Sequence, residues 1–113
     1  TGTFVSLQYG DHGPDQAEYL GIPHWRKGVD DLDEFAAITK ALDGVVTVLQ
    51  TALHFAGAIG TPCVVLCSEW HAWPFHGEGK DMMWYGDHLQ LIRQRDNDWV
   101  PVFEEARNVL ANL

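Results

Sequence analysis

The sequence predicts an α/β fold, a Rossmann-like three-layer α/β/α domain built around a short parallel sheet. Two short apolar runs, at residues 45–49 and 63–67, have the length and composition of strands buried on both faces of such a sheet. An apolar segment of helical length separates them, which gives the order of a βαβ unit. Because 113 residues suit one domain, we expect a single, partial Rossmann-like domain over residues 1–113.

The first part of the chain predicts a strand followed by a turn. Residues 3–8 alternate in polarity, as a strand does, and the turn-forming residues of segment 9–14 end it. Segment 15–30 is predicted to be mostly loop, with a helical turn over residues 15–20.

A helix is the clearest prediction in the next segment. Asp31 suits the N-cap, and Glu34 three residues later completes a pattern that resembles a capping box. The apolar stripe of this helix consists of Leu32, Phe35, Ala36, Ile38 and Leu42. Asp43 and Gly44 then supply the C-terminal stop.

The second half predicts the remaining sheet and its covering layers. Residues 52–59 form a helix rich in small side chains, and segment 68–86 is a long aromatic loop. A strand at 89–93 precedes a closing helix over about 100–113. The apolar face of that helix consists of Val102, Ala106, Val109, Leu110 and Leu113. Because so short a sheet leaves an edge open, we expect a covering partner, either a missing domain or a second copy.

Composition excludes several classes of function. The chain has 16 Asp and Glu against 7 Lys and Arg, so its formal net charge of −9 disfavours nucleic-acid binding. No apolar run approaches the ~20 residues of a membrane span. The N-terminus lacks a signal-peptide pattern, and Thr1 is interpreted as a processed, tagged or excised end. A cytoplasmic location is expected.

Thiol, serine and metal chemistry are not predicted. On a strand, Cys63 and Cys67 lie on one face about 13 Å apart, too far to form a disulfide, so we expect buried, reduced thiols. Ser68 lacks the elbow motif of a nucleophile. Six histidines are present, but the spacing of His71 and His76 completes no zinc set, so neither metal nor cofactor is expected.

The candidate site is the junction between the strand at 45–49 and the following helix. In open parallel sheets, ligands bind beyond the carboxyl ends of the strands, where helix N-termini present free N–H groups. If Thr51 caps the helix, the amides of Ala52, Leu53 and His54 suit a diphosphate. The alternative is an ordinary capped helix in which His54 is a hydrogen-bonded core histidine.

Two further regions have open alternatives. Ser6 and Gln8, on one face at the end of the first predicted strand, either contact a ligand or are ordinary strand-end polar groups. The aromatic loop either stacks on a base or sugar ring, or simply covers the edge of the sheet.

An ordered set of short segments resembles a known family. These segments are FVSLQ at 4–8, D-x-FAA at 33–37, LD at 42–43, QTALHFAGAIGTP at 50–62, AW at 72–73, M-x-WY at 82–85, RQ at 93–94 and DW at 98–99, where x marks a position that is not part of the match. Together they resemble the C-terminal domain of bacterial glycosyltransferases attached to tetratricopeptide repeats. Those domains are similar to heptosyltransferases and, more distantly, to O-linked N-acetylglucosamine transferases. The resemblance runs from Phe4 to Leu113.

The resemblance implies a GT-B architecture, in which two Rossmann-like domains face each other across a cleft. The C-terminal domain holds a nucleotide-diphosphate sugar as donor substrate, without a metal. The positions that the resemblance and the helix geometry assign to the nucleotide-sugar are Ser6, Gln8, Gln50, Thr51, Ala52, Leu53, His54 and Trp73. The catalytic residues are not identified, because the missing N-terminal domain supplies the acceptor site and the general base.

Two positions depart from the family pattern. Pro74 replaces an arginine, and Met83 replaces the proline before Trp-Tyr. If the arginine contacts phosphate in the family, its loss removes about 1–3 kcal/mol of binding free energy. The leading hypothesis is therefore a donor-binding domain that is inactive alone. The alternative is a non-catalytic remnant acting as a binding or dimerisation module. A flavodoxin-like nucleotide-binding regulator is a third hypothesis, but the chain lacks a flavin-phosphate loop.

Overall fold

The structure, a computed structural model, describes residues 2–70 and 73–113, with only the backbone for Lys27 and Val29. The chain divides into two compact units, Thr1–Ile38 and Thr39–Leu113, which are described separately below. The expectation of one domain over residues 1–113 stays a prediction. In the described part of the chain, no helix has the length and apolar character needed to cross a bilayer.

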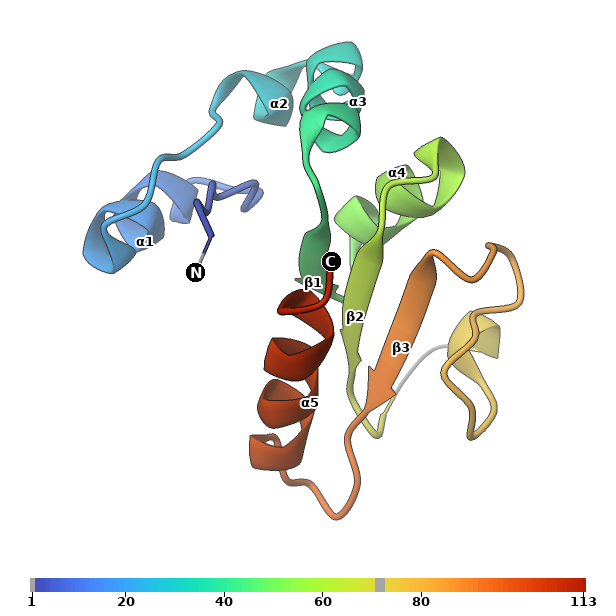
Figure 1. The fold of residues 1–113 in the computed structure, drawn as a ribbon. Coiled ribbons are helices and arrows are strands. Elements are labelled where there is room, and N and C mark those ends of the chain that lie inside the picture. Colours follow the sequence, from blue (N-terminus) through green and yellow to red (C-terminus); the bar gives the residue numbers. More distant parts are fainter. Residues whose placement is uncertain (1, 71–72) are drawn as a thin grey trace. The chain divides into compact units, whose positions relative to one another are not determined.

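A three-stranded parallel sheet forms the centre of the second unit (Figure 1). Its strands are β1 (Val45–Val48), β2 (Cys63–Cys67) and β3 (Leu89–Arg93), in the order β1-β2-β3. Val45 lies opposite Cys63, and Cys63 lies opposite Leu89. The predicted α/β class with a short parallel sheet is confirmed.

One helix covers each face of the sheet. Leu53 and Ala56 of α4 (Thr51–Ile59) pack in one buried cluster with Val65 of β2. On the other face, Val102 of α5 (Val100–Leu110) packs in a second cluster with Val64. Neighbouring residues of β2 therefore face different helices, and the second unit has the predicted α/β/α layers.

Strand β1 differs from the prediction that both of its faces are buried. Val45 and Thr47 are buried, but Val46 and Val48 are 42% and 48% exposed. Val46 pairs with Val64 on the face that α5 covers. Because α5 packs on β2 and β3, the valines of the neighbouring edge strand remain exposed.

The closing helix α5 is shorter than predicted. It ends at Leu110, and its buried residues are Val102 and Ala106. Leu113 lies beyond the helix and is 58% exposed. Its side chain lies over Gly44, where a Cβ would come within 2.6 Å of Leu113 Cδ1.

The aromatic loop folds back along the outer edge of β3. The amide of Leu91 donates to the Lys80 carbonyl at 2.7 Å, and an antiparallel bridge joins Asp81 to Gln90. Met82 and Phe75 are buried in the cluster that includes α4. Covering the sheet edge, one of the two alternatives for this loop, is therefore one of its roles.

The first unit contains more helix and less strand than predicted. Helix α1 (Gly13–Leu20) ends at Gly21, whose φ of 68° is left-handed, and α2 (Lys27–Asp30) forms in the predicted loop. The strand predicted at residues 3–8 is wrong. Only Ser6 forms a bridge there, with His24, because no neighbouring strand among the described residues pairs with the rest of the segment.

Helix α3 (Leu32–Ala41) begins at the predicted cap. Asp31 Oδ1 accepts hydrogen bonds from the amides of Asp33 at 2.9 Å and Glu34 at 3.3 Å. The predicted N-cap is confirmed.

Gly57 of α4 allows the aromatic loop to approach the helix. A Cβ at this position would come within 2.5 Å of the Tyr85 ring. Replacing Gly57 with alanine is therefore expected to push Tyr85 away and to lower the free energy of unfolding by about 1–3 kcal/mol. Urea unfolding followed by tryptophan fluorescence measures this change.

Gly79→Ala is the matched control, because, apart from the neighbouring residues in the chain, no heavy atom of the described residues lies within 4 Å of the added Cβ. Equal stability of the Gly57→Ala and Gly79→Ala variants would show that the packing of Tyr85 on α4 does not require a glycine at position 57.

Candidate functional site

The N-terminus of α4 lies directly after β1, at the carboxyl edge of the sheet. Gln50 occupies the N-cap position with extended backbone (φ −150°, ψ −176°), and no side chain among the described residues caps the helix. The predicted capping by Thr51 is therefore wrong, because Thr51 is already the first helical residue. The Gln50 amide instead donates from Nε2 to Thr47 Oγ1 at 2.9 Å, which anchors the turn to β1.

The amides of the first helical turn are not equally available. The N–H of Leu53 donates to the Gln50 carbonyl at 3.2 Å, and Leu53 is fully buried. Ala52 is 7% exposed, whereas Thr51 is exposed and His54 is half-buried. Access from solvent to this turn is therefore through Thr51 and His54.

The imidazole of His54 is held by the aromatic loop. Its Nδ1 lies 2.9 Å from the Tyr85 hydroxyl. The rings of Trp84 and Tyr85 each lie 5.9 Å from the imidazole, and the ring of Phe75 lies 6.4 Å away, all measured between centroids. These contacts fix the plane of the imidazole on the first turn of α4.

Two exposed tryptophans extend this cluster. Trp73 and Trp84 are 62% and 50% exposed, and their rings meet edge to face at 5.6 Å between centroids. Of the predicted site residues, Trp73 and His54 therefore belong to one aromatic cluster, with Trp84 between them. Trp84 and Tyr85 were not among the predicted site residues, although both lie in the aromatic segment 68–86.

Ser6 and Gln8 belong to the first unit. Ser6 Oγ accepts the amide of Gln8 at 3.3 Å and lies 3.2 Å from His24 Nδ1. The side chain of Gln8 is exposed. Ser6 therefore makes a local contact within its own unit.

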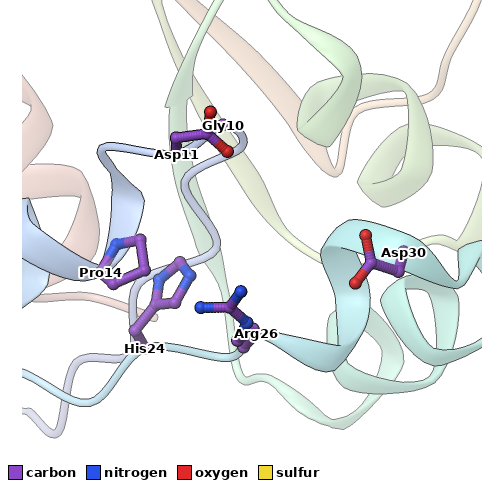
Figure 2. Close-up of a pocket in the computed structure, with 6 residues that line it drawn as sticks. All are labelled: Gly10, Asp11, Pro14, His24, Arg26 and Asp30. Carbon is purple, nitrogen blue, oxygen red and sulfur yellow. The ribbon is translucent and has the colours of Figure 1, made fainter.

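A pocket of about 290 Å³ lies in the same unit. Its lining residues are Gly10, Asp11, Pro14, His24, Arg26 and Asp30 (Figure 2). These residues lie in the segments predicted to be turn (9–14) and mostly loop (15–30), and no pocket was predicted there. The available signal was a histidine and an arginine two residues apart, after a cluster of glycine and aspartate.

Gln94, which follows β3, is a buried polar residue that was not among the predicted site residues. Its backbone N–H donates to the Cys67 carbonyl at 2.8 Å, and its side-chain Oε1 accepts a hydrogen bond from the backbone N–H of Glu69 at 3.1 Å. Its Nε2 is buried without a partner within the described residues. Gln94 therefore ties the ends of β2 and β3 together at the carboxyl edge.

The burial of both thiols disfavours the thiolate form that nucleophilic chemistry needs. Cys63 and Cys67 are free and buried, as predicted. Burial raises the pKa of Cys63 to about 12, and burial raises the pKa of Cys67 against the opposing charge of Arg93. Across residues 2–70 and 73–113, no group of His, Cys, Asp or Glu is arranged to hold a metal ion. His71, one of the histidines weighed for zinc, lies outside the described residues.

Comparison with known proteins finds a relative that is similar to the chain over part of that relative's length. Protein FlbA of Caulobacter vibrioides (strain ATCC 19089 / CIP 103742 / CB 15) is 41% identical to the chain over 117 aligned residues, which cover 97% of the chain and 19% of FlbA. The chain thus spans about a fifth of the length of this relative. No model of a known protein family matches the chain, and no solved structure matches it.

The raised pKa of Cys63 predicts a loss of stability in alkali. Between the ordinary value of 9.0 and about 12, the folded chain keeps a proton that the unfolded chain releases. The free energy of unfolding therefore falls as the pH rises through this range, by up to about 1.4 kcal/mol per pH unit. The slope from Cys63 is about half of this at pH 9.0 and fades over roughly one pH unit below it. Urea unfolding from pH 8 to pH 11 measures the slope.

Cys63→Ala is the control, because other groups also titrate in alkali. The difference in unfolding free energy between the parent and this variant isolates the thiol. A difference that stays constant with pH would contradict the assignment.

Proposed function

We propose that the chain is the donor-binding part of a GT-B glycosyltransferase, and that it binds a nucleotide-diphosphate sugar at the N-terminus of α4. The observation that carries the proposal is the position of His54 on the first turn of this helix, fixed by Tyr85 and next to exposed tryptophan rings. The ordered family-like segments and the parallel sheet support the same function.

The helix terminus suits a diphosphate for electrostatic reasons. The positive end of the helix dipole and the amides of the first turn stabilise negative charge, and they act on a departing diphosphate without a metal. Thr51 and His54 are the accessible side chains there, and each can donate a hydrogen bond to phosphate or ribose oxygens. A base from another domain deprotonates the acceptor in this scheme.

The exposed tryptophans supply the apolar part of the proposed site. Trp73 and Trp84 offer ring faces and edges that can stack on a nucleobase or a sugar ring. Since Trp84 also contacts the His54 imidazole, a ring stacked on the tryptophans and a diphosphate near His54 suit one ligand.

Pro74, which replaces the family's arginine, is buried in the short 3₁₀ helix η1 (Trp73–Phe75). Reintroducing arginine there would bury a charge, so any change in affinity would mix with a loss of folding. A test of the proposal therefore needs variants of accessible residues.

The test is titration of the chain with UDP, ADP and GDP by calorimetry and ¹H–¹⁵N NMR. We expect one of them to bind with a dissociation constant below about 1 mM. His54→Ala is expected to weaken binding about tenfold, since a hydrogen bond to a charged group is lost. His12→Ala is the matched control. His12 is exposed at the N-cap of α1, and its side chain makes no capping hydrogen bond to that helix, so its removal should leave nucleotide binding unchanged.

Tyr85→Phe separates contact from positioning. It removes the hydroxyl that holds His54 Nδ1 but leaves the imidazole, so we expect a smaller loss of affinity than with His54→Ala. Absence of binding by all three nucleotides at millimolar concentration, with the folded spectrum intact, would contradict the proposal.

A cytoplasmic location is part of the proposal. Two free, buried cysteines support it, because reducing compartments keep thiols unpaired.

The second candidate is a non-catalytic module that dimerises through β1. The observation that favours it is the edge position of β1, which pairs only with β2 among the described residues and exposes Val46 and Val48. Such an edge is a template for pairing with a second copy.

Val46→Lys tests this candidate. If β1 pairs between copies, a charge on its exposed face should weaken self-association at least tenfold in sedimentation equilibrium, because like charges then meet across the edge. Val100→Lys, at a 62% exposed position on α5, is the control. A parent chain that is monomeric at millimolar concentration would remove the dimer hypothesis.

A further inference from the structure

The pocket of the first unit contains polar groups that the proposed donor site does not use. It lies beside the start of α1, and three segments line it: the turn at Gly10 and Asp11, the residue His24, and the segment that carries Arg26 and Asp30 (Figure 2). Its volume of about 290 Å³ lies just below the range of about 300–1,000 Å³ that is typical of sites for drug-sized ligands, so only a small ligand fits.

His24 is held rigidly in the pocket wall. Its Nδ1 lies 3.2 Å from Ser6 Oγ, and the backbone on both sides of it is bonded to Ser6, through the Pro23 carbonyl and the Trp25 amide. Gly13 gives the ring room, because a Cβ there would come within 2.9 Å of His24 Cε1.

This fixed ring leaves one nitrogen without a partner. His24 Nε2 is buried and makes no hydrogen bond within the described residues. When the Ser6 hydroxyl donates to Nδ1, Nε2 carries the proton and is a donor in need of an acceptor; when Nδ1 instead donates to Ser6 Oγ, Nε2 is an acceptor. An anionic ligand in the pocket would select the tautomer that has the proton on Nε2.

Arg26 adds a cation to the same pocket. Arg26 is exposed, and among the described residues no hydrogen bond or ion pair joins its guanidinium to a partner. An arginine without a partner among those residues is notable in a chain with 16 acidic and 7 basic residues. Guanidinium binds phosphate and carboxylate through two parallel N–H donors, and an imidazole N–H can supply a third.

Two carboxylates line the pocket with these donors. Asp11 follows Gly10, which has a left-handed φ of 96°, and Asp30 ends α2. Carboxylates repel a bare anion but accept hydrogen bonds from hydroxyl groups. Donors and acceptors in one pocket therefore match a ligand that has both an anionic group and hydroxyls.

We propose that this pocket binds a small hydroxylated oxyanion, a sugar phosphate or a sugar acid. Arg26 and His24 Nε2 donate to the phosphate or carboxylate oxygens, and Asp11 and Asp30 accept from hydroxyl groups. The site is separate in its residues from the donor site at α4, so neither proposal depends on the other.

The first experiment titrates the full chain with glucose 6-phosphate, glucuronate, inorganic phosphate and glucose, followed by ¹H–¹⁵N NMR. We expect the amide signals of Gly10, Asp11 and Arg26 to shift with the two charged sugars. Inorganic phosphate should bind more weakly and glucose not at all. The stronger of the two charged sugars identifies the anionic group that the pocket prefers.

Arg26→Gln tests the cation. It should weaken binding of the charged sugars roughly tenfold or more, because it removes charge-assisted hydrogen bonds. Arg107→Gln makes the same change in net charge at an exposed position of α5 and should alter affinity less than twofold. Equal losses with both variants would overturn the proposal, since they would show a general effect of charge.

Asp30→Asn tests the hydroxyl contact by the sign of its effect. Removing this negative charge should strengthen binding of inorganic phosphate but weaken binding of glucose 6-phosphate. Stronger binding of both ligands would overturn the hydroxyl contact.

A direct signal comes from the His24 ring. Long-range ¹H–¹⁵N spectra should show a protected Nε2 proton in the complex with glucose 6-phosphate. Unchanged spectra of His24 and of the pocket amides at tens of millimolar of either charged sugar would overturn the site. This failure is distinguishable from failure of the donor site, which is tested with nucleotides and His54→Ala.

Discussion

The complete burial of strand β2 is the constraint on which the second unit depends, because all five of its residues are buried. Its side chains alternate between two clusters, with Val65 facing α4 and Val64 facing α5. A strand of this kind needs paired strands on both edges and a covering layer on both faces, which β1, β3, α4 and α5 supply. The N-terminus of α4 reaches the carboxyl edge of the sheet as a consequence of this arrangement.

Contacts between distant segments determine which side chains lie at that edge. Arg93 at the end of β3 donates from Nε to the Gly79 carbonyl at 2.7 Å and from Nη1 to the Phe75 carbonyl. These bonds fasten the aromatic loop, and the bare backbone of Gly57 lets Tyr85 approach α4 and hold His54. The orientation of the imidazole thus depends on β3, on the loop and on a glycine of its own helix.

The first unit shows where local patterns mislead. Residues 3–8 alternate in polarity as a strand does, but this alternation indicates only which side chains would lie on each face of a strand. A strand also needs a neighbouring strand with which its backbone can pair. Within the described residues that neighbour is the single position His24, 18 residues along the chain from Ser6. The bridge between Ser6 and His24 also holds His24 in the wall of the pocket. The wrong strand prediction at residues 3–8 and the unpredicted pocket therefore have one cause, a contact between residues far apart in the sequence.

The sequence by itself determined the class of the fold, the three strands of the sheet and the helices α3, α4 and α5, because apolar periodicity, glycine stops and an acidic cap act over a few residues. It also predicted that a helix begins directly after β1 and that both thiols are buried. Only the tertiary structure decided that Val46 and Val48 stay exposed, that Leu53 uses its amide within the first turn, and that Tyr85 meets His54. Those outcomes depend on where a helix crosses the sheet and where a loop returns, and contacts between residues far apart in the chain determine both.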